Sequence, residues 1–336
     1  MMPESQYHNI TIIGDGGMGT VLAMLLCEKG IATRMWGHDA AQLAEMERRR
    51  ENVKFLPGYK LPETLVFEAD DALATAGADL IVSAVPCQFI RPVWKRLKNY
   101  VPEVAAIVSV AKGIENATLM RPSEILAEVL GDGVDVAVLS GPTIADELAK
   151  RLPATACAAA SDEALAESIQ RAFACSWLRV YTNTDVVGVE LAGALKNVIA
   201  IAAGIIDGVG AGDNAKAALL ARGLAEITRL GLAMGAQEHT FAGLTGLGDL
   251  VTTCISPSGR NRSFGERIGR GQTREQAQGA TDSVVEGVAT CESVVGLAAR
   301  YNVEMPITEA VYDVIFKGKP VSAAIEDLMT RGLKAE

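Results

Sequence analysis

The N-terminal region contains the stretch NITIIGDGGMGT at residues 9–20, and the expected fold follows from it. The apolar, β-branched run Asn9–Ile13 predicts a buried strand, and the glycine-rich turn after it leads into a helical pattern. In this context Gly14 permits a tight turn, Gly16 lets the backbone approach a pyrophosphate, and Gly19 lets helix and strand pack closely. The helix start also offers free N–H groups to phosphates. The stretch therefore predicts a dinucleotide-binding loop, the alternative being a glycine-rich turn that binds nothing.

The alternation of strand and helix continues through the first half of the chain. The first helix is expected over Met18–Lys29 and the second strand over Ala32–Trp36. Further short strands are expected at residues 80–85, 105–110, 136–139, 154–159 and 178–181. This order predicts an α/β fold with a doubly wound parallel sheet of the Rossmann type.

The strand signal stops near residue 185. Helices are expected from there at residues 187–206, 214–234, 260–270, 286–300 and 306–316. The sequence thus predicts a dinucleotide-binding domain over residues 1–185 and an all-α substrate-binding and catalytic domain over residues 186–336.

Composition excludes several classes of protein. The 336 residues include 31 Lys plus Arg, 41 Asp plus Glu and 3 His, for a formal charge of −10. A general nucleic-acid binder needs a positive contact face, so this class is excluded. The six cysteines are scattered without a Cys-x-x-Cys pair, and they indicate neither a zinc site nor a disulfide framework.

The N-terminus is polar and lacks the pattern of a secretory signal. The apolar window 187–206 is interrupted by Glu190, Lys196 and Asn197, which favours a buried helix over a membrane span. These features predict a cytoplasmic protein with no membrane insertion and no metal.

The residues after the second expected strand bear on cofactor choice. NAD-binding domains place an acid here on the adenosine ribose, but the sequence reads Trp36-Gly37-His38-Asp39. Asp39 could reach the ribose, although it also stands where the N-cap of a helix from Ala40 would stand. His38 could lie near the adenine or favour a 2′-phosphate. The choice between NAD and NADP stays open.

Lys196 is the most informative single residue. Gly193, Lys196, Asn197, Ala200 and Gly204 share one helix face, which is small apart from two polar side chains. A desolvated lysine beside a second cation has a lowered pKa and can accept a proton near neutral pH, as oxidation of a hydroxyl requires. The alternatives are a lysine that reaches the surface or one that pairs with Glu190.

Two other segments of the first domain follow expected strands. Lys112 comes directly after one of them, at the sheet edge where ligands bind, and is the candidate second cation. The run Ser140-Gly141-Pro142-Thr143 follows another. Its hydroxyl and N–H groups could contact a ligand, or Thr143 could only cap the next helix.

The second domain contains an acidic and a basic motif. Gly246-Leu247-Gly248-Asp249-Leu250 places an acid after glycines that can expose it. Residues 256–270 hold four arginines against Glu266, a local charge of +3, and Arg260-Asn261 opens a helix there. An arginine and an amide at a helix start suit a phosphate. For at least two of these arginines a solvated surface role is expected.

Taken together and in order, these motifs resemble those of bacterial NAD(P)-dependent glycerol-3-phosphate dehydrogenase. The resemblance extends from residue 9 to about residue 318 and also includes the segments FLPG at 55–58, GVE at 188–190, RGLAE at 222–226 and VEG at 285–287. It implies a homodimer that interconverts sn-glycerol 3-phosphate and dihydroxyacetone phosphate with NAD or NADP and supplies glycerol 3-phosphate to phospholipid synthesis.

The resemblance also implies site residues. Lys196 would exchange the substrate proton, and Lys112 would touch both cofactor and substrate. The other implied substrate residues are Gly141, Thr143, Asp249, Gly259, Arg260 and Asn261. The implied cofactor residues are Gly14, Gly16, Gly17, Met18, Gly19, His38, Lys112, Ala145, Arg260, Val284 and Glu286.

The sequence departs from the family pattern at three of these positions. Gly17 and Met18 stand where the family commonly has a serine and an aromatic residue, and Gly259 stands where a serine usually binds substrate. Two alternatives to the main function stay open. One is another two-domain dehydrogenase of the 6-phosphogluconate or ketopantoate reductase type, and the other is a nicotinamide-sensing protein without turnover.

Overall fold

The computed structural model describes residues 5–131, 134, 136–281 and 284–333, and the chain forms two compact units. The first unit runs to Lys112 and resumes over Arg121–Glu190, whereas the second consists of Gly113–Met120 and the chain from Leu191 onward. The segment Gly113–Met120 is tied to the second unit because the Ser293 hydroxyl donates to the Ile114 carbonyl at 3.0 Å. The domain boundary at 185/186 does not anticipate this segment and stays a prediction.

One sheet of eight strands forms the first unit within the described residues, in the order β3-β2-β1-β4-β5-β6-β7-β8. The strands are β1 (Asn9–Ile13), β2 (Ala32–Trp36), β3 (Val66–Glu68), β4 (Leu80–Ser83), β5 (Ala106–Ser109), β6 (Val136–Ser140), β7 (Ala154–Ala159) and β8 (Leu178–Asn183). Ile13 at the end of β1 pairs with Trp36 on β2 and with Ser83 on β4. The strand order therefore reverses at β1, and open α/β sheets bind ligands at the carboxyl ends of strands at such a point.

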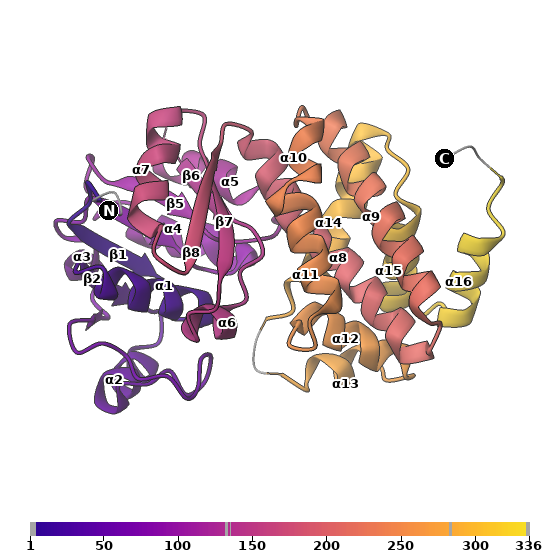
Figure 1. The fold of residues 1–336 in the computed structure, drawn as a ribbon, viewed down its shortest axis with the longest axis horizontal. Helices are drawn as coiled ribbons and strands as arrows, with labels where there is room; N and C mark the ends of the chain where they lie inside the picture. Colours follow the sequence, from indigo (N-terminus) through magenta and orange to yellow (C-terminus); the bar gives the residue numbers. More distant parts are fainter. Residues whose placement is uncertain (1–4, 132–133, 135, 282–283, 334–336) are drawn as a thin grey trace. The chain divides into compact units, whose positions relative to one another are not determined.

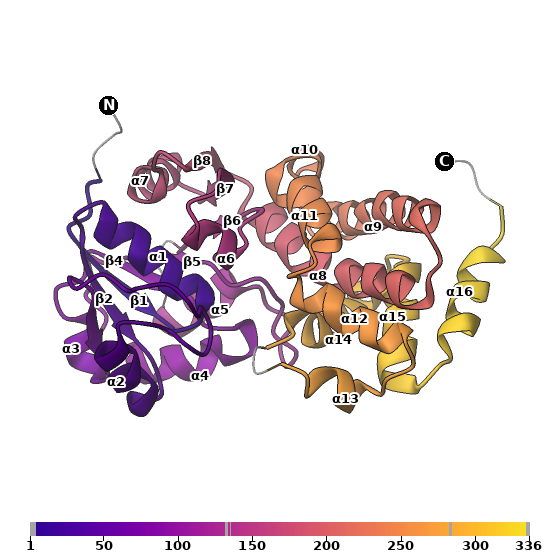
Figure 2. The same ribbon diagram turned by 60° about the horizontal axis from the view of Figure 1, so that its bottom comes forward.

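Helices cover both faces of this sheet, as the Rossmann-type prediction requires. They are α1 (Gly17–Glu28), α2 (Ala40–Arg49), α3 (Asp71–Thr75), α4 (Cys87–Leu97), α5 (Pro122–Leu130), α6 (Ala145–Ala149) and α7 (Glu163–Phe173). Helices α1, α6 and α7 pack together on one face and α3, α4 and α5 on the other (Figures 1 and 2). Asp39 caps α2 by accepting hydrogen bonds from the N–H groups of Ala41 and Gln42, as its capping interpretation predicted.

The sheet differs from the expected all-parallel form at one pair of strands. Strand β7 runs antiparallel to β6, whereas every other pair in the sheet is parallel. The connecting helix α6 has five residues, a length of about 7.5 Å. It is too short to return the chain along a strand of about 17 Å, so the chain re-enters the sheet in the opposite direction.

The second unit is helical throughout its described residues. Its helices are α8 (Val186–Val209), whose first five residues belong to the first unit, α9 (Asp213–Ala233), α10 (Glu238–Ala242), the π-helix η1 (Leu244–Gly248), α11 (Asp249–Ile255), α12 (Arg260–Gly269), α13 (Arg274–Gln278), α14 (Glu286–Tyr301), α15 (Pro306–Lys317) and α16 (Val321–Met329). The five helices expected from the sequence correspond to α8, α9, α12, α14 and α15.

Helix α8 is long and apolar enough to cross a membrane, but 94% of its most apolar 18-residue window is buried within the protein. Its small face is covered by α12. A Cβ on Gly204 would lie 1.9 Å from the carbonyl oxygen of Arg262, and one on Gly265 would lie 2.0 Å from that of Ile201. The glycines therefore let the two helix backbones touch. At Gly204, the space beside the small face of α8 is therefore filled by the backbone of α12.

A buried carboxylate elsewhere in the second unit predicts a pH-dependent stability. Glu226 on α9 accepts hydrogen bonds from the N–H groups of Ile307, at 2.6 Å, and Thr308, at 3.3 Å, at the start of α15. Burial raises the pKa of Glu226 from 4.5 to about 7, although these hydrogen bonds oppose the rise. The folded state thus holds a proton that the unfolded state releases between these two pH values.

The stability that this proton contributes is complete below pH 4.5 and is lost as the pH rises through about 7. Because Gln cannot ionise, Glu226→Gln should gain stability relative to the wild type between pH 5 and pH 8, by roughly 3 kcal/mol at most. Scanning calorimetry of both proteins at the two pH values measures this difference. If the stability difference between Glu226→Gln and the wild type is the same at pH 5 and pH 8, the raised pKa of Glu226 is contradicted.

Candidate active site

The glycine-rich loop after β1 has the geometry that its sequence predicts. Gly14 has φ +118°, and a Cβ there would lie 2.7 Å from the carbonyl oxygen of Ala84. A Cβ on Gly19 would lie 2.2 Å from the carbonyl oxygen of Gly14, so only glycine lets α1 pack this closely on the loop. Gly16 directly precedes α1 and provides no side-chain cap. A Cβ on Gly16 would have no neighbouring atom within 4 Å. The open space at Gly16 and the uncapped helix start fit a dinucleotide pyrophosphate.

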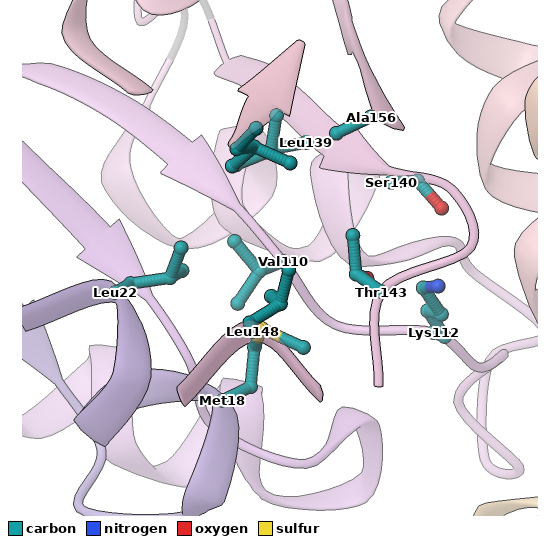
Figure 3. A pocket seen from close by; sticks show the side chains of 10 residues that line it. Met18, Leu22, Val110, Lys112, Leu139, Ser140, Thr143, Leu148 and Ala156 are labelled. Atoms are coloured by element: carbon teal, nitrogen blue, oxygen red, sulfur yellow. The ribbon is translucent and has the colours of Figure 1, made fainter. Parts of the chain in front are cut away.

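The loop also explains one departure from the family pattern. A Cβ on Gly17 would lie 2.8 Å from the carbonyl oxygen of Phe55, so a serine does not fit this loop conformation. The same Cβ would lie 3.7 Å from Ala145 Cβ, which brings two of the implied cofactor residues together. The neighbouring Met18 is half-buried and faces a pocket of the first unit (Figure 3).

This pocket lies beside the C-terminal ends of β5 and β6 and the N-terminal end of α1. Met18, Lys112, Ser140 and Thr143 line it together with apolar side chains (Figure 3). The Lys112 ammonium donates to the Gly141 carbonyl at 2.7 Å, and the Thr143 hydroxyl donates to the same oxygen at 3.1 Å. The structure thus joins residues that the sequence placed after two separate strands, Lys112 after one and Gly141 and Thr143 after the other.

The alternative role of Thr143 as a helix cap is wrong. The residue before α6 is Ile144, and no side chain caps this helix. The Thr143 hydroxyl instead turns back to Gly141. The neighbouring Ser140 hydroxyl is buried and has no hydrogen-bond partner among the described residues, which makes it available to a ligand.

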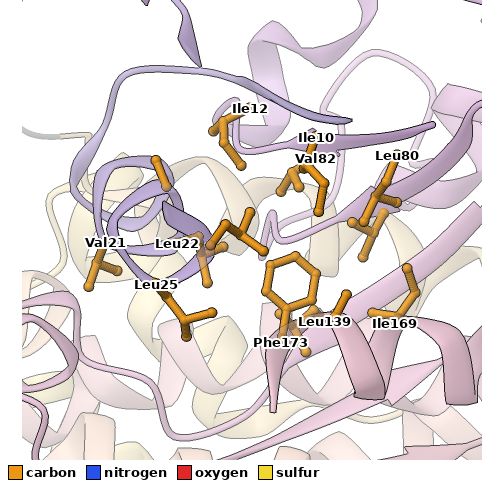
Figure 4. Packing of buried hydrophobic residues seen from close by; sticks show 14 of the residues in the cluster. Ile10, Ile12, Val21, Leu22, Leu25, Leu80, Val82, Leu139, Ile169 and Phe173 are labelled. Carbon is orange, nitrogen blue, oxygen red and sulfur yellow. The ribbon is translucent and has the colours of Figure 1, made fainter. Parts of the chain in front are cut away.

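The packing behind the loop holds it in place. Val21, Leu22 and Leu25 of α1 pack in the same cluster as Ile10 on β1 and Phe173 on α7 (Figure 4). Each of these five side chains is at most 2% exposed. A helix buried over this face cannot shift without opening the core, so its N-terminus is held in a fixed position next to the glycine-rich loop.

Lys196 lies in the second unit and pairs with Asp249. Its ammonium is 2.8 Å from Asp249 Oδ1, with side-chain exposures of 8% and 3%. The Thr253 hydroxyl accepts a further short hydrogen bond from the ammonium. The acidic neighbour compensates the cost of burying the charge. Sequence reasoning missed Thr253, although its spacing of four residues from Asp249 places both on one face of α11.

Both structural alternatives for Lys196 are wrong. The side chain is buried and does not reach the surface. Glu190 does not pair with it but accepts hydrogen bonds from the Arg121 guanidinium at 2.5 Å and from the Ser123 hydroxyl at 2.6 Å, within the first unit. The expected proximity of Lys112 to Lys196 stays a prediction.

The π-helix η1 positions Asp249. It ends at Gly248, directly before α11, and a Cβ on Gly246 would lie 2.0 Å from the carbonyl oxygen of Phe241. Glycine at position 246 thus lets the chain wind tightly against α10 before Asp249 begins the next helix. Single π-turns of this kind often occur at functional sites.

The start of α12 is joined to the lysine helix. Asn261 donates from Nδ2 to Asn197 Oδ1 at 2.9 Å and accepts from the Gly287 N–H, also at 2.9 Å. Arg260 is exposed and donates to the Val284 carbonyl at 3.2 Å. Three of the implied site segments, 196–197, 259–261 and 284–287, therefore meet around the start of α12.

The solvated surface role expected for some arginines of the basic segment fits Arg270, whose side chain is 64% exposed and pairs with Glu266. Arg262 does not have that role, because its side chain is only 16% exposed and pairs with Asp207 at 2.6 Å. Gly259 precedes α12 without a side-chain cap, and a Cβ there would lie 3.0 Å from the carbonyl oxygen of Thr253. That contact is tight, so a serine at this position would require the neighbouring backbone to shift slightly.

Two further groups border this cluster. Glu286 begins α14, and its Oε2 atom is buried. Burial raises the pKa of the Cys254 thiol to about 12, although the Lys196 charge opposes the rise. Cys254 is therefore a neutral thiol and a poor nucleophile at neutral pH. Within this cluster, the lysine is the better group for proton exchange.

The first unit thus carries a dinucleotide loop on a Rossmann-type sheet, and the second carries a buried lysine beside a cationic helix start. The fold and these residues define a nicotinamide-dinucleotide-dependent oxidoreductase.

Comparison with known proteins identifies the family. Residues 9–166 match the family model for the N-terminus of NAD-dependent glycerol-3-phosphate dehydrogenase, and residues 185–326 match the model for its C-terminus. The chain is 50% identical to the glycerol-3-phosphate dehydrogenase (NAD(P)+) of Geobacter sp. strain M21, over 97% of this chain and 98% of that protein. This chain belongs to the NAD-dependent glycerol-3-phosphate dehydrogenase family.

Solved structures agree with this family. A crystal structure of glycerol-3-phosphate dehydrogenase from Coxiella burnetii matches with a TM-score of 0.93 and 36% identity, over 96% of this chain and 99% of that one. A ketopantoate reductase from Ralstonia eutropha matches with a TM-score of 0.62 and 15% identity, over 96% and 99% of the two chains. The second match shows a shared fold alone.

Proposed function

We propose that this protein interconverts sn-glycerol 3-phosphate and dihydroxyacetone phosphate with NAD or NADP. Glycerol-3-phosphate dehydrogenases that are about half identical over nearly the full chain support this proposal. The residues support it as well, because the second unit combines a buried lysine with an arginine and an amide at a helix start. These groups suit proton exchange and phosphate binding on one small substrate.

The first unit would hold the cofactor. The N–H groups at the start of α1, with Gly14, Gly16, Gly17, Met18 and Gly19, would hold the pyrophosphate, and the residues after β2 would hold the adenosine. Lys112 and Thr143 would face the nicotinamide end, because they line the pocket next to Met18. A bound nicotinamide supplies or accepts the hydride at the substrate carbon.

The second unit would hold the substrate. Arg260 and the N–H groups at the start of α12 would bind the phosphate through charge-assisted hydrogen bonds, with Asn261 beside them. In the reduction, the Lys196 ammonium gives a proton to the C2 oxygen as that oxygen gains negative charge. In the oxidation, the lysine takes the hydroxyl proton back. Asp249 and Thr253 hold the Lys196 side chain in position, as the ammonium before the reduction and as the amine that accepts the proton in the oxidation.

One observation carries this assignment. The side chains of Asn261 and Asn197 form a hydrogen bond of 2.9 Å, and each is the direct sequence neighbour of a proposed substrate residue, Arg260 or Lys196. Because both helix segments are buried and packed, the spacing between the phosphate-binding start of α12 and the lysine is fixed by the fold. A fixed spacing selects a substrate with its phosphate at one distance from the reacting carbon.

A spectrophotometric screen tests the proposed function. The purified protein is mixed with NADH or NADPH, and dihydroxyacetone phosphate is compared with ketopantoate. We expect rapid oxidation of the reduced cofactor with dihydroxyacetone phosphate and little with ketopantoate. A preference for ketopantoate favours the other dehydrogenase class, and cofactor binding with no turnover on either compound favours a sensing protein.

Arg260 is the residue to change first in the phosphate site. Arg260→Ala should raise the KM for dihydroxyacetone phosphate about ten- to a hundredfold, because a charge-assisted hydrogen bond is worth about 1.5–3 kcal/mol. Steady-state kinetics with saturating cofactor measures the change. Arg270→Ala, at the residue directly after the same helix, is the matched control, since Arg270 pairs with Glu266 at the surface. An unchanged KM in Arg260→Ala removes Arg260 from the phosphate site.

We further infer the setting in which the enzyme acts. Residues 1–185 would bind the cofactor, and residues 186–336 would bind the substrate and carry the catalytic lysine. The protein would act in the cytoplasm as a homodimer, without membrane insertion, and would supply glycerol 3-phosphate for phospholipid synthesis. The family and the burial of α8 within the protein support these inferences.

A further inference from the structure

The carboxylate of Asp15 lies next to the end of β2, where β2 itself provides no acidic residue. The first residue after β2 is Gly37, so no side chain extends from the position at which NAD-binding domains place an acid. The space next to Gly37 is filled by Asp15 of the glycine-rich loop. A Cβ on Gly37 would lie 2.9 Å from Asp15 Cγ and 3.1 Å from Asp15 Oδ2. The loop thus brings an acid to the end of β2 from the neighbouring strand.

Main-chain contacts fix this arrangement. The Gly14 N–H donates to the carbonyl of Trp36 at 2.8 Å, which joins the loop to the end of β2. The buried amide of Asn52 donates to the Asp15 carbonyl and to the Thr20 hydroxyl, each at 2.8 Å. These hydrogen bonds hold the backbone on both sides of the Asp15 side chain, which places that side chain next to Gly37.

The Asp15 carboxylate is buried without a donor from another residue. Asp15 is 8% exposed, and among the described residues no other residue donates a hydrogen bond to its side chain. Burial raises the pKa of the Asp15 carboxyl, although the hydrogen bond from its own backbone and the charges of His38 and Lys54 oppose the rise. A buried carboxylate that has only its own N–H as a donor is costly, so a ligand with hydroxyl donors at this place would relieve part of that cost.

We propose that Asp15 accepts hydrogen bonds from the adenosine ribose hydroxyls and makes this enzyme prefer NADH to NADPH. The proposal rests on the proposed cofactor site in the first unit. The 2′- and 3′-hydroxyls are donors that NADH presents to the end of β2. NADPH has a phosphate in place of the 2′-hydroxyl, which would lie beside a second anion and would leave the carboxylate with one donor fewer.

The neighbouring charged groups do not supply this discrimination. Asp39 is exposed, and its Oδ1 caps α2. His38 is exposed and would attract a phosphate if it acted alone. Asp15 is the buried member of this group and the one that contacts Gly37, so the preference should follow residue 15.

Binding of the two cofactors in the absence of substrate tests the proposal. Trp36 is buried at the end of β2, so quenching of tryptophan fluorescence can report the Kd of NADH and of NADPH for the full-length protein. We expect the wild type to bind NADH at least about tenfold more tightly than NADPH. Asp15→Ala should reduce this ratio at least about tenfold, through weaker NADH binding and tighter NADPH binding.

Two further variants sharpen the test. Asp15→Asn keeps the size of the side chain and removes the charge, so it should also lose discrimination against NADPH. Asp39→Asn is the matched control, because asparagine caps a helix as well as aspartate does. It should leave the ratio of the two Kd values within about twofold of the wild type. The thermal midpoint of each variant checks that it is folded.

The outcomes separate this proposal from the proposed function. A wild type that prefers NADPH overturns the role of Asp15, as does an unchanged ratio in both Asp15 variants. Loss of discrimination in Asp39→Asn alone would assign the ribose contact to Asp39. Binding of neither cofactor by a folded wild type would overturn the cofactor site itself and the proposed function with it.

Discussion

Lys196→Met should lower kcat by about 10²–10⁴-fold, the usual contribution of a positioned acid or base. Methionine keeps the length and apolar stem of the side chain, so the packing of α8 should survive. The change removes the group that exchanges the C2 proton and leaves Asp249 without its cationic partner. Binding of NADH to the first unit should stay close to that of the wild type.

Steady-state turnover and fluorescence titration of the same preparation measure both effects. The matched control is Lys216→Met, which removes a partly buried lysine of the same unit that pairs with Asp207 at 2.8 Å. The control should retain kcat within a few fold. Near wild-type turnover in Lys196→Met would remove this lysine from the chemistry.

Arg121→Met should destabilise the first unit by about 3–5 kcal/mol. Arg121 directly precedes α5. Its guanidinium lies 2.5 Å from the carboxylate of Glu190, whose side chain is 1% exposed. Burial raises the pKa of Glu190, although the Arg121 charge opposes the rise. Without the arginine, the glutamate must either stay charged and unpaired or bind a proton. Either outcome costs folding free energy.

Tryptophan fluorescence can isolate this effect. The three tryptophans of the chain, Trp36, Trp94 and Trp177, all belong to the first unit, so urea unfolding followed by their emission reports that unit. The double variant Arg121→Met with Glu190→Gln should recover much of the loss, because it leaves no buried charge. A loss under about 1 kcal/mol in Arg121→Met would show that the pair contributes no more than a surface salt bridge.

The sequence was sufficient for the features that follow from local patterns. The loop over Gly14–Gly19 and the cap at Asp39 depend on neighbouring residues, so their geometry could be predicted. Five helices of the second unit, α8, α9, α12, α14 and α15, follow from apolar periodicity, whereas α10, η1, α11, α13 and α16 were not predicted. The edge strand Val66–Glu68 was missed because it has three residues and only partly buried side chains, which give no apolar run.

Features that depend on contacts between distant segments were harder to predict. The partner of Lys196 is Asp249, 53 residues further along the chain, rather than the nearby Glu190. The cluster at the start of α12 likewise depends on a contact between Asn197 and Asn261, 64 residues apart. The chain order indicated which residues carry polar chemistry, but the tertiary packing decides which of them meet.

The Asp15 carboxylate illustrates the same limit. In the sequence, the end of β2 shows a glycine and no acid, and the choice of cofactor is open. The structure brings a carboxylate to Gly37 from the loop after β1, because parallel strands bring their carboxyl ends to one edge of the sheet. A residue type that is missing from its usual position in the sequence can thus be supplied in the structure by a residue from another segment.

The central claim is that this protein oxidises a hydroxyl on a carbon chain held by its phosphate. The most direct measurement is the initial rate of NAD reduction with sn-glycerol 3-phosphate, compared with glycerol at the same concentrations. We predict a kcat/KM at least about 10³-fold higher for the phosphorylated substrate, because a site built to bind a phosphate strongly rejects the analogue without it. Equal rates with the two alcohols, or oxidation of neither by a protein that binds the cofactor, would contradict the account.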